Sequence, residues 1–168
     1  PENLDCYRNK REAVKCCSNE WVLLLDSDNK ISPTYLEMLS SYDWNPDIAY
    51  LPVFAEPHFD YREYMGVTVS KSNAASLARQ QTFLTALNTA NYFFHRESYL
   101  KVWDDSVNPH TADSLYQNYN WLKSGRSLFF VPGLHYFHRV HPGSHYKNNH
   151  HKTRGFAKSI EQQMLHLK

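Results

Sequence analysis

Two carboxylates, Asp26 and Asp28, stand one residue apart directly behind the apolar run WVLLL. Ionised carboxylates this close repel each other, and burying either one without a partner is costly. A hard divalent cation such as Mg2+ or Mn2+ takes carboxylate oxygens as ligands and turns that repulsion into a shared attraction. The alternative is that Asp26 caps a turn while Ser27, Asp28 and Asn29 form a solvated loop, as such residues often do.

Histidine is a second residue type that could take part in chemistry, and all ten histidines lie at or after position 58. In the segment LHYFHRVH, alternation places His138 and Tyr136 on one face of a strand, and His135 and Phe137 on the other. A single histidine on a strand is either a hydrogen-bonded core residue or a metal ligand. The pattern leaves both interpretations open for His138.

The carboxylate pair must be positioned by the elements around it. Residues 5 to 18 carry apolar side chains at helical spacing among basic ones, which predicts a short amphipathic helix. The continuous apolar run EWVLLLD is typical of a strand covered on both faces. In the following segment SPTYLEMLSSY, Ser32 is expected to cap a helix that has Pro33 at its first position.

The middle of the chain is predicted to continue this α/β pattern. Residues 47 to 54, DIAYLPVF, suit a strand and complete a strand-helix-strand unit of the right length for a parallel crossover. Residues 55 to 82 lose that regularity, so we expect an excursion from the sheet. A strand over residues 88 to 94 then leads into a helix that begins near Arg96.

The last third of the chain supplies one more helix and two more strands. Helical spacing in TADSLYQNYNWLKSG predicts a helix with Gly125 as its C-cap, and SLFFVP and LHYFHRV are predicted strands. The polar tail from about residue 142 is expected to be flexible or to form a terminal helix from about Ser159. In such an α/β fold ligands gather at the carboxyl ends of strands, where Asp26 and Asp28 stand.

Composition excludes several classes of protein. A chain of 168 residues suits a single domain, and 42% hydrophobic with 21% charged residues is typical of a soluble globular protein without a transmembrane segment. A net charge of +1 without long basic runs argues against nucleic acid as a partner. The odd number of cysteines, Cys6, Cys16 and Cys17, indicates reduced thiols, so we expect a cytoplasmic location.

From about residue 7 to residue 145 the sequence resembles the nucleotide-sugar glycosyltransferases of the GT-A fold, nearest the inverting family 2. The resemblance rests on five segments in the family's order: Arg8 and Asn9 followed by Ala13, WVLLLDSDNKISPTYLEML, NYFFHRESYLKV, ADSLYQNYNWLKSGRSLFFVP and HYFHRVHPGS. It implies a GT-A-like, Rossmann-like mixed sheet flanked by helices, with residues 1 to 168 forming one domain.

Two departures from the family pattern bear on the expected organisation. The family's domain opens with a strand-helix-strand half that holds the nucleotide base, and no segment here corresponds to it. We therefore expect a partial domain, the catalytic and acceptor-side portion, or one piece of a longer or paired protein. The family's acidic segment usually carries Glu-Asp, whereas Ala112 precedes Asp113 here.

The resemblance implies that Asp28 binds Mn2+ or Mg2+, that Asp26 lies near the ribose or the metal, and that His138 is the third protein ligand. The cation would stabilise the charge that develops on a nucleoside diphosphate as the sugar departs. An imidazole ligand would shift the preference toward Mn2+. Arg8 and Asn9 could reach the donor, since Arg binds phosphate bidentately, although a surface helix explains both equally well.

By the same resemblance, Asp113 is the general base that takes the proton of the acceptor hydroxyl. A carboxylate can do this with an ordinary pKa if its geometry is right, because the hydroxyl becomes acidic only in the transition state. The alternative is that Asp113 caps a helix, a role that Thr111 could also take. Asp104 and Asp105 are rival carboxylates, whose position after a helix favours a solvated turn.

The sequence thus predicts a metal-dependent, hexosyltransferase-like inverting enzyme that moves a sugar from a nucleoside diphosphate donor to a hydroxyl group of a glycan or another acceptor. The aromatic residues His58, Phe59, Tyr61 and Tyr64, with Met65, could stack against the acceptor or pack under a loop. The alternatives are a non-catalytic, truncated domain that binds carbohydrate or a protein partner, and a His-rich metal-binding domain. A homo-oligomer is a further expectation, because an uncovered sheet edge invites pairing.

Overall fold

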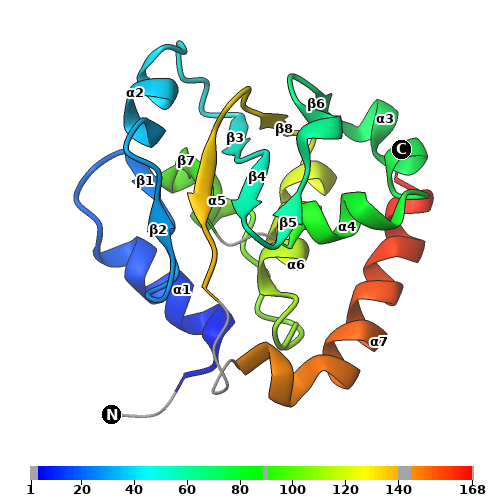
Figure 1. The fold of residues 1–168 in the computed structure, drawn as a ribbon. Helices are drawn as coiled ribbons and strands as arrows, with labels where there is room; N and C mark the ends of the chain where they lie inside the picture. Colours follow the sequence, from blue (N-terminus) through cyan, green and yellow to red (C-terminus); the bar gives the residue numbers. More distant parts are fainter. Residues whose placement is uncertain (1–3, 89–90, 140–144, 168) are drawn as a thin grey trace.

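The computed structural model describes residues 4–88, 91–139 and 145–167. They form two mixed sheets flanked by helices (Figure 1), which confirms the α/β class. The larger sheet has the strand order β1-β7-β3-β8-β6. Its strands are β1 (Trp21–Leu23), β7 (Phe93–His95), β3 (Ile48–Leu51), β8 (Ser127–Phe130) and β6 (Thr68–Val69).

The strand that leads to the carboxylate pair, β1, forms one edge of the larger sheet. It pairs antiparallel with β7, which also pairs antiparallel with β3. The predicted parallel crossover is confirmed, since β1 and β3 run in the same direction in one sheet, although β7 lies between them. Because β7 enters the sheet between them, the residues just before β7 arrive beside the end of β1, where Asp26 lies.

The smaller sheet has the strand order β2-β9-β4-β5. Its strands are β2 (Lys30–Ile31), β9 (His135–Phe137), β4 (Phe54–Glu56) and β5 (Phe59–Asp60). The prediction that residues 55 to 82 leave the sheet is wrong, because β4 and β5 belong to this sheet and β6 forms an edge of the larger one. Since β9 pairs with β2, the sheet brings His138 close to the segment that contains Asp28.

Helices surround the two sheets (Figure 1). They are α1 (Cys6–Cys16), α2 (Tyr35–Ser40), the 3-10 helix η1 (Arg62–Tyr64), α3 (Lys71–Leu77), α4 (Gln81–Leu87), α5 (Arg96–Lys101), α6 (Asp113–Lys123) and α7 (His145–Leu165). Helix α1 starts where Asp5 accepts a hydrogen bond from the N–H of Arg8. Helix α2 starts after Thr34, two residues beyond the predicted cap Ser32, whose carbonyl instead accepts from the N–H of Tyr35.

Helix α6 lies in the interior, and every residue from Asp113 to Leu122 is buried. It packs against α1, α3, α4, α7 and β8. Its polar side chains find partners there: Gln117 Nε2 donates to the carbonyl of Tyr99 (3.1 Å) and Asn118 Nδ2 to that of Leu87 (2.7 Å). As predicted, the helix ends before Gly125, whose φ of +91° favours glycine.

Helix α7 begins much earlier than the predicted start near Ser159. It runs from His145 and packs against α6 and α3, on the side of α6 away from α1 (Figure 1). Among its side chains from residue 151 onward, for which burial is described, Thr153, Ile160 and Met164 are buried. The beginning of the tail, residues 140 to 144, lies outside the described residues, so the expected flexibility there stays a prediction.

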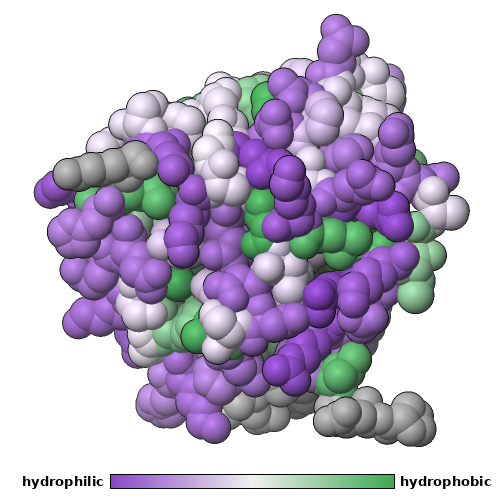
Figure 2. Space-filling view, turned by 180° about the vertical axis from the view of Figure 1, so that it is seen from behind, coloured by the Kyte–Doolittle hydropathy of each residue, from purple (hydrophilic) through white to green (hydrophobic). Residues whose placement is uncertain are grey.

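Aromatic rings fill much of the core, and Trp121, Tyr35, Tyr92, Tyr99 and Phe83 are among the largest fully buried side chains. The face seen from behind is mainly hydrophilic, with apolar residues between the polar ones (Figure 2). Of the helices described here, none combines the length and the apolar character that crossing a membrane requires.

Candidate active site

Asp26 lies just beyond the carboxyl end of β1, where the sequence places it. Its N–H donates to Asn91 Oδ1 (3.0 Å), and its carbonyl accepts from the N–H of Asn29 (3.0 Å). Asn91 is fully buried, and its carbonyl accepts from the hydroxyl of Tyr35 (2.8 Å). The turn anticipated as an alternative is therefore present, but it is anchored to the buried segment before β7 rather than left to solvent.

Asp113 is the first residue of α6 and is only 7% exposed. The N-cap of the helix is Ala112, and no side chain caps the helix through a hydrogen bond. Thr111, the other predicted capping residue, instead pairs its hydroxyl with that of Thr153. Asp113 therefore makes no capping hydrogen bond, although its charge lies in the first turn and still favours the positive end of the helix, and its carboxylate is held by a contact outside its own helix.

Lys10 on α1 joins these two carboxylates. Its Nζ lies 2.7 Å from Asp113 Oδ2 and 3.3 Å from Asp26 Oδ1. The two oxygens are therefore no farther apart than these distances together, although 87 positions separate the residues in the sequence. Burial alone would lower the pKa of Lys10, but Asp113 and, more weakly, Asp26 outweigh it and raise that pKa, so Lys10 carries its positive charge at neutral pH.

His138 follows β9 and is fixed by its own N–H, which donates to the carbonyl of Glu56 (2.7 Å). Its ring lies among aromatic neighbours, with ring centroids 5.3 Å from His58 and 5.2 Å from Phe59. Burial, with a contribution from His58, lowers the pKa of His138, while the charges of Asp28 and Asp26 act in the opposite direction.

The three predicted metal ligands do not form a ready metal site. Within residues 4–88, 91–139 and 145–167, no three His, Cys, Asp or Glu side chains are grouped to hold an ion. Asp26 shares its carboxylate with Lys10, so a cation would have to compete with that ammonium. His138 Nδ1 is buried without a hydrogen-bond partner in the described structure and could still coordinate. These residues are not grouped around an ion in the described structure, and metal binding by Asp26, Asp28 and His138 stays a prediction.

The other residues predicted to contact the donor lie at the surface of α1, and that contact stays a prediction. Arg8 and Asn9 are exposed, and Asn9 Nδ2 donates to the nearby carbonyl of Leu4 (3.0 Å). Helix α1 presents Lys10 to the site instead, a residue that the sequence analysis missed. A signal was available, because Tyr7 and Val14 are buried three residues before and four residues after Lys10, which puts all three on one helical face.

The rival carboxylates have partners of their own. Asp104 accepts hydrogen bonds from the hydroxyl of Tyr116 (2.6 Å) and the N–H of Ser106 (2.8 Å), and these bonds lower its pKa. Asp105 pairs with Arg11 (2.7 Å) at the surface. Both are therefore part of the turn after α5, as the sequence predicts, and Asp113 is the acid that lies beside Asp26.

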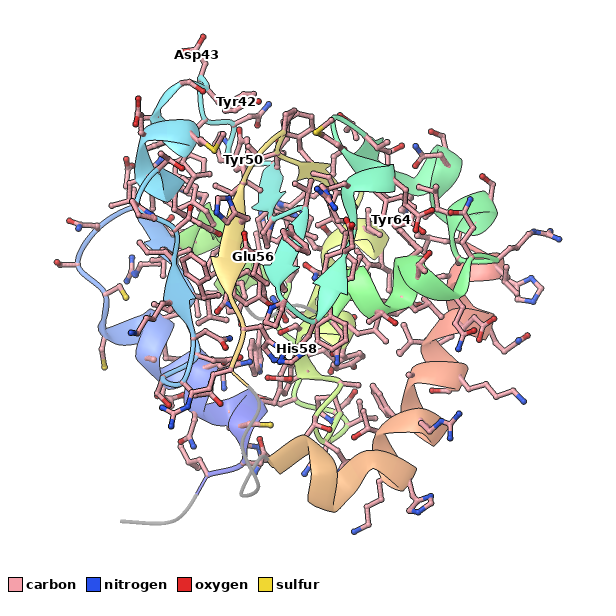
Figure 3. The ribbon with its side chains drawn as sticks, viewed as in Figure 1. Tyr42, Asp43, Tyr50, Glu56, His58 and Tyr64 are labelled. Atoms are coloured by element: carbon pink, nitrogen blue, oxygen red, sulfur yellow. The ribbon has the colours of Figure 1, made fainter. Side chains whose placement is uncertain are left out.

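The aromatic segment divides between core and surface. Tyr61 and Tyr64 are buried, whereas Phe59 and Met65 are exposed at 36% and 54%. Figure 3 shows His58 in the turn below Glu56, at the lower end of the smaller sheet and away from Asp43 at the top. Because His58 and Phe59 contact the ring of His138, the exposed part of the segment adjoins the candidate site.

Comparison with known proteins adds no family assignment. No family model matches the chain, and no curated protein matches it.

Proposed function

We propose that this chain is an inverting glycosyltransferase of the GT-A type, which moves a sugar from a nucleoside diphosphate donor to a hydroxyl acceptor. The observation that carries the proposal is the convergence of Asp26 and Asp113 on Lys10. These are the acids to which the sequence resemblance gives the donor and the acceptor roles. The shared contact with Lys10 places both acids at one site, as the proposed roles require.

In the proposed reaction, Asp113 takes the proton of the acceptor hydroxyl. The hydroxyl oxygen forms a bond to the anomeric carbon while the bond from that carbon to the phosphate oxygen breaks, and the electron pair leaves with the nucleoside diphosphate. Attack from the face opposite the leaving group inverts the anomeric carbon. The deep position of Asp113 at the start of a buried helix suits a base whose geometry must be fixed.

The proposal keeps the predicted requirement for a divalent cation as a separate point to test, because the residues as arranged do not form a metal site. A cation, when bound, would offset the charge of the diphosphate.

The test uses the 168-residue chain with a panel of nucleoside diphosphate sugars, and measures release of the nucleoside diphosphate with and without Mn2+. Asp113→Asn is expected to lower release by roughly 10²- to 10⁴-fold, the contribution of a general base, while the Kd for the nucleoside diphosphate measured by calorimetry stays near wild type. Retained turnover in Asp113→Asn would refute its role as the base. Asp28→Ala should abolish any binding that depends on Mn2+.

A non-catalytic carbohydrate-binding module is the second candidate, and the exposed rings of Phe59 and Phe137 favour it, at 36% and 41% exposure. Sugar rings stack on such aromatic faces. This candidate predicts glycan binding that Phe59→Ala weakens, together with no release of nucleoside diphosphate from any donor. Release that depends on Asp113 would exclude it.

A further inference from the structure

Lys10 is a largely buried cation in a position that the sequence resemblance leaves without a role. Its side chain is 16% exposed, and it contacts one carboxylate on the donor side and one on the acceptor side of the proposed site. Asp113, its closer partner, has a side chain that is only 9% exposed. A carboxylate that deep needs a partner of opposite charge, and Lys10 supplies it.

We propose that Lys10 is a positioning residue, which holds the carboxylate of Asp113 in the orientation needed for proton transfer and ties it to the turn of Asp26. This inference rests on the proposed function. Burial of α6 fixes the backbone of Asp113, but the side chain could still adopt more than one rotamer. The ion pair at 2.7 Å selects one of them.

Helix α1 is docked firmly enough for Lys10 to do this. One turn before Lys10, the hydroxyl of Tyr7 donates to Gln117 Oε1 (3.1 Å), and Gln117 lies one turn after Asp113 on α6. The ring of Tyr7 also stacks on Trp103, with centroids 3.7 Å apart. The Tyr7–Gln117 and Lys10–Asp113 contacts together join the same faces of α1 and α6 at two points, which fixes the register between the helices.

A base contributes fully only when it is placed accurately, because a displacement of about 1 Å can cost on the order of 10² in rate. Lys10 acts through Asp113 in this account, so its effect on turnover must disappear when Asp113 can no longer serve as a base. A purely structural lysine has no such dependence, because replacing it would lower the amount of folded protein without changing the kcat of the molecules that remain folded.

The test combines Lys10→Met with Asp113→Asn in the release assay. Lys10→Met keeps the length of the side chain and removes its charge; kcat is expected to fall by roughly 10- to 100-fold, while the Kd for the nucleoside diphosphate changes less than about threefold. In the Asp113→Asn background the same change should alter kcat by less than about twofold. Lys15→Met, at an exposed position of the same helix that pairs only with Glu12 among the described residues, is the matched control and should keep wild-type kcat.

Wild-type kcat in Lys10→Met, or an equal loss in both backgrounds, would overturn the positioning role and leave the proposed function standing. Absence of release by the wild-type chain with every donor would overturn both. If Lys10→Met does not fold, as judged by circular dichroism, Lys10→Gln replaces it. The amide of the introduced glutamine can donate a hydrogen bond to Asp113 but carries no charge. The effect of Lys10→Gln on kcat should likewise disappear in the Asp113→Asn background.

Discussion

Removing the ammonium of Lys10 should destabilise the folded chain strongly, because two carboxylates would lose their shared partner. Lys10→Met is the informative change, since the methionine side chain fills the space of the lysine stem. The unfolded chain is affected little, as all three groups are solvated there. The decrease in the free energy of unfolding therefore measures the contribution of the ion pairs in the folded state.

The size of the effect follows from the exposure of each partner. Asp113, with a side chain 9% exposed and Oδ2 at 2.7 Å from the ammonium, becomes an unpaired buried charge, which typically costs about 3–5 kcal/mol. The side chain of Asp26 is 38% exposed and its Oδ1 lies 3.3 Å from the ammonium. Solvent screening therefore limits the loss of stability from this second pair to about 0–1 kcal/mol. Nearly all of the expected loss therefore comes from Asp113.

Urea denaturation followed by circular dichroism measures the free energy of unfolding. Asp113→Asn removes the charge that is left unpaired, so the double variant Lys10→Met/Asp113→Asn should be more stable than Lys10→Met alone. Lys15→Met removes an exposed pair with Glu12 at i,i+3 and should cost no more than about 0.5 kcal/mol. A loss below about 1 kcal/mol in Lys10→Met, or strict additivity with Asp113→Asn, would refute a buried ion pair at this place.

Two further predictions concern other parts of the chain. Burial, with a smaller contribution from Asp113, raises the pKa of the Cys6 thiol to about 11, so iodoacetamide at pH 8 should modify exposed Cys16 well before Cys6, as mass spectrometry of the peptides would show. Equal labelling of both thiols at pH 8 would contradict the burial of Cys6. Because the folded state disfavours the Cys6 thiolate, the contribution of this thiol to the free energy of unfolding is complete below its ordinary pKa of 9.0 and is lost as the pH rises toward 11. Met164→Ala should cost about 2–5 kcal/mol in urea denaturation, because Met164 is fully buried in α7, whereas Gln162→Ala on the exposed side of that helix should cost little. Similar stability of the two variants would mean that α7 does not pack as described.

Local signals account for the elements that the sequence predicts well. The apolar run before Asp26 forms β1, and the helical spacing before Gly125 forms α6. Helix α7 shows where such signals stop. Residues 145 to 158 are mostly polar and carry little apolar periodicity, so the predicted start lay near Ser159. The helix is longer because its packing on α6 and α3 stabilises turns that the local sequence does not favour by itself.

The sequence pattern could not predict which strands lie next to each other in the sheets. Strand-helix-strand spacing fits a parallel pair, yet β7 enters between β1 and β3 after a long detour. That insertion brings Asn91 to the N–H of Asp26. The predicted loop excursion failed for the same reason, since β4 pairs with β9 and β6 pairs with β8, and both partners lie far away in the sequence.

The sequence by itself determined which acids could do chemistry: Asp26 and Asp28 at the end of an apolar strand, and Asp113 near the start of a predicted helix. Only the tertiary structure decided that Asp26 and Asp113 meet, and that Lys10 lies between them rather than Arg8 or Asn9. The physical reason is that periodicity records which face of an element is buried, whereas the partner of a buried charge is chosen by packing between elements that are far apart along the chain.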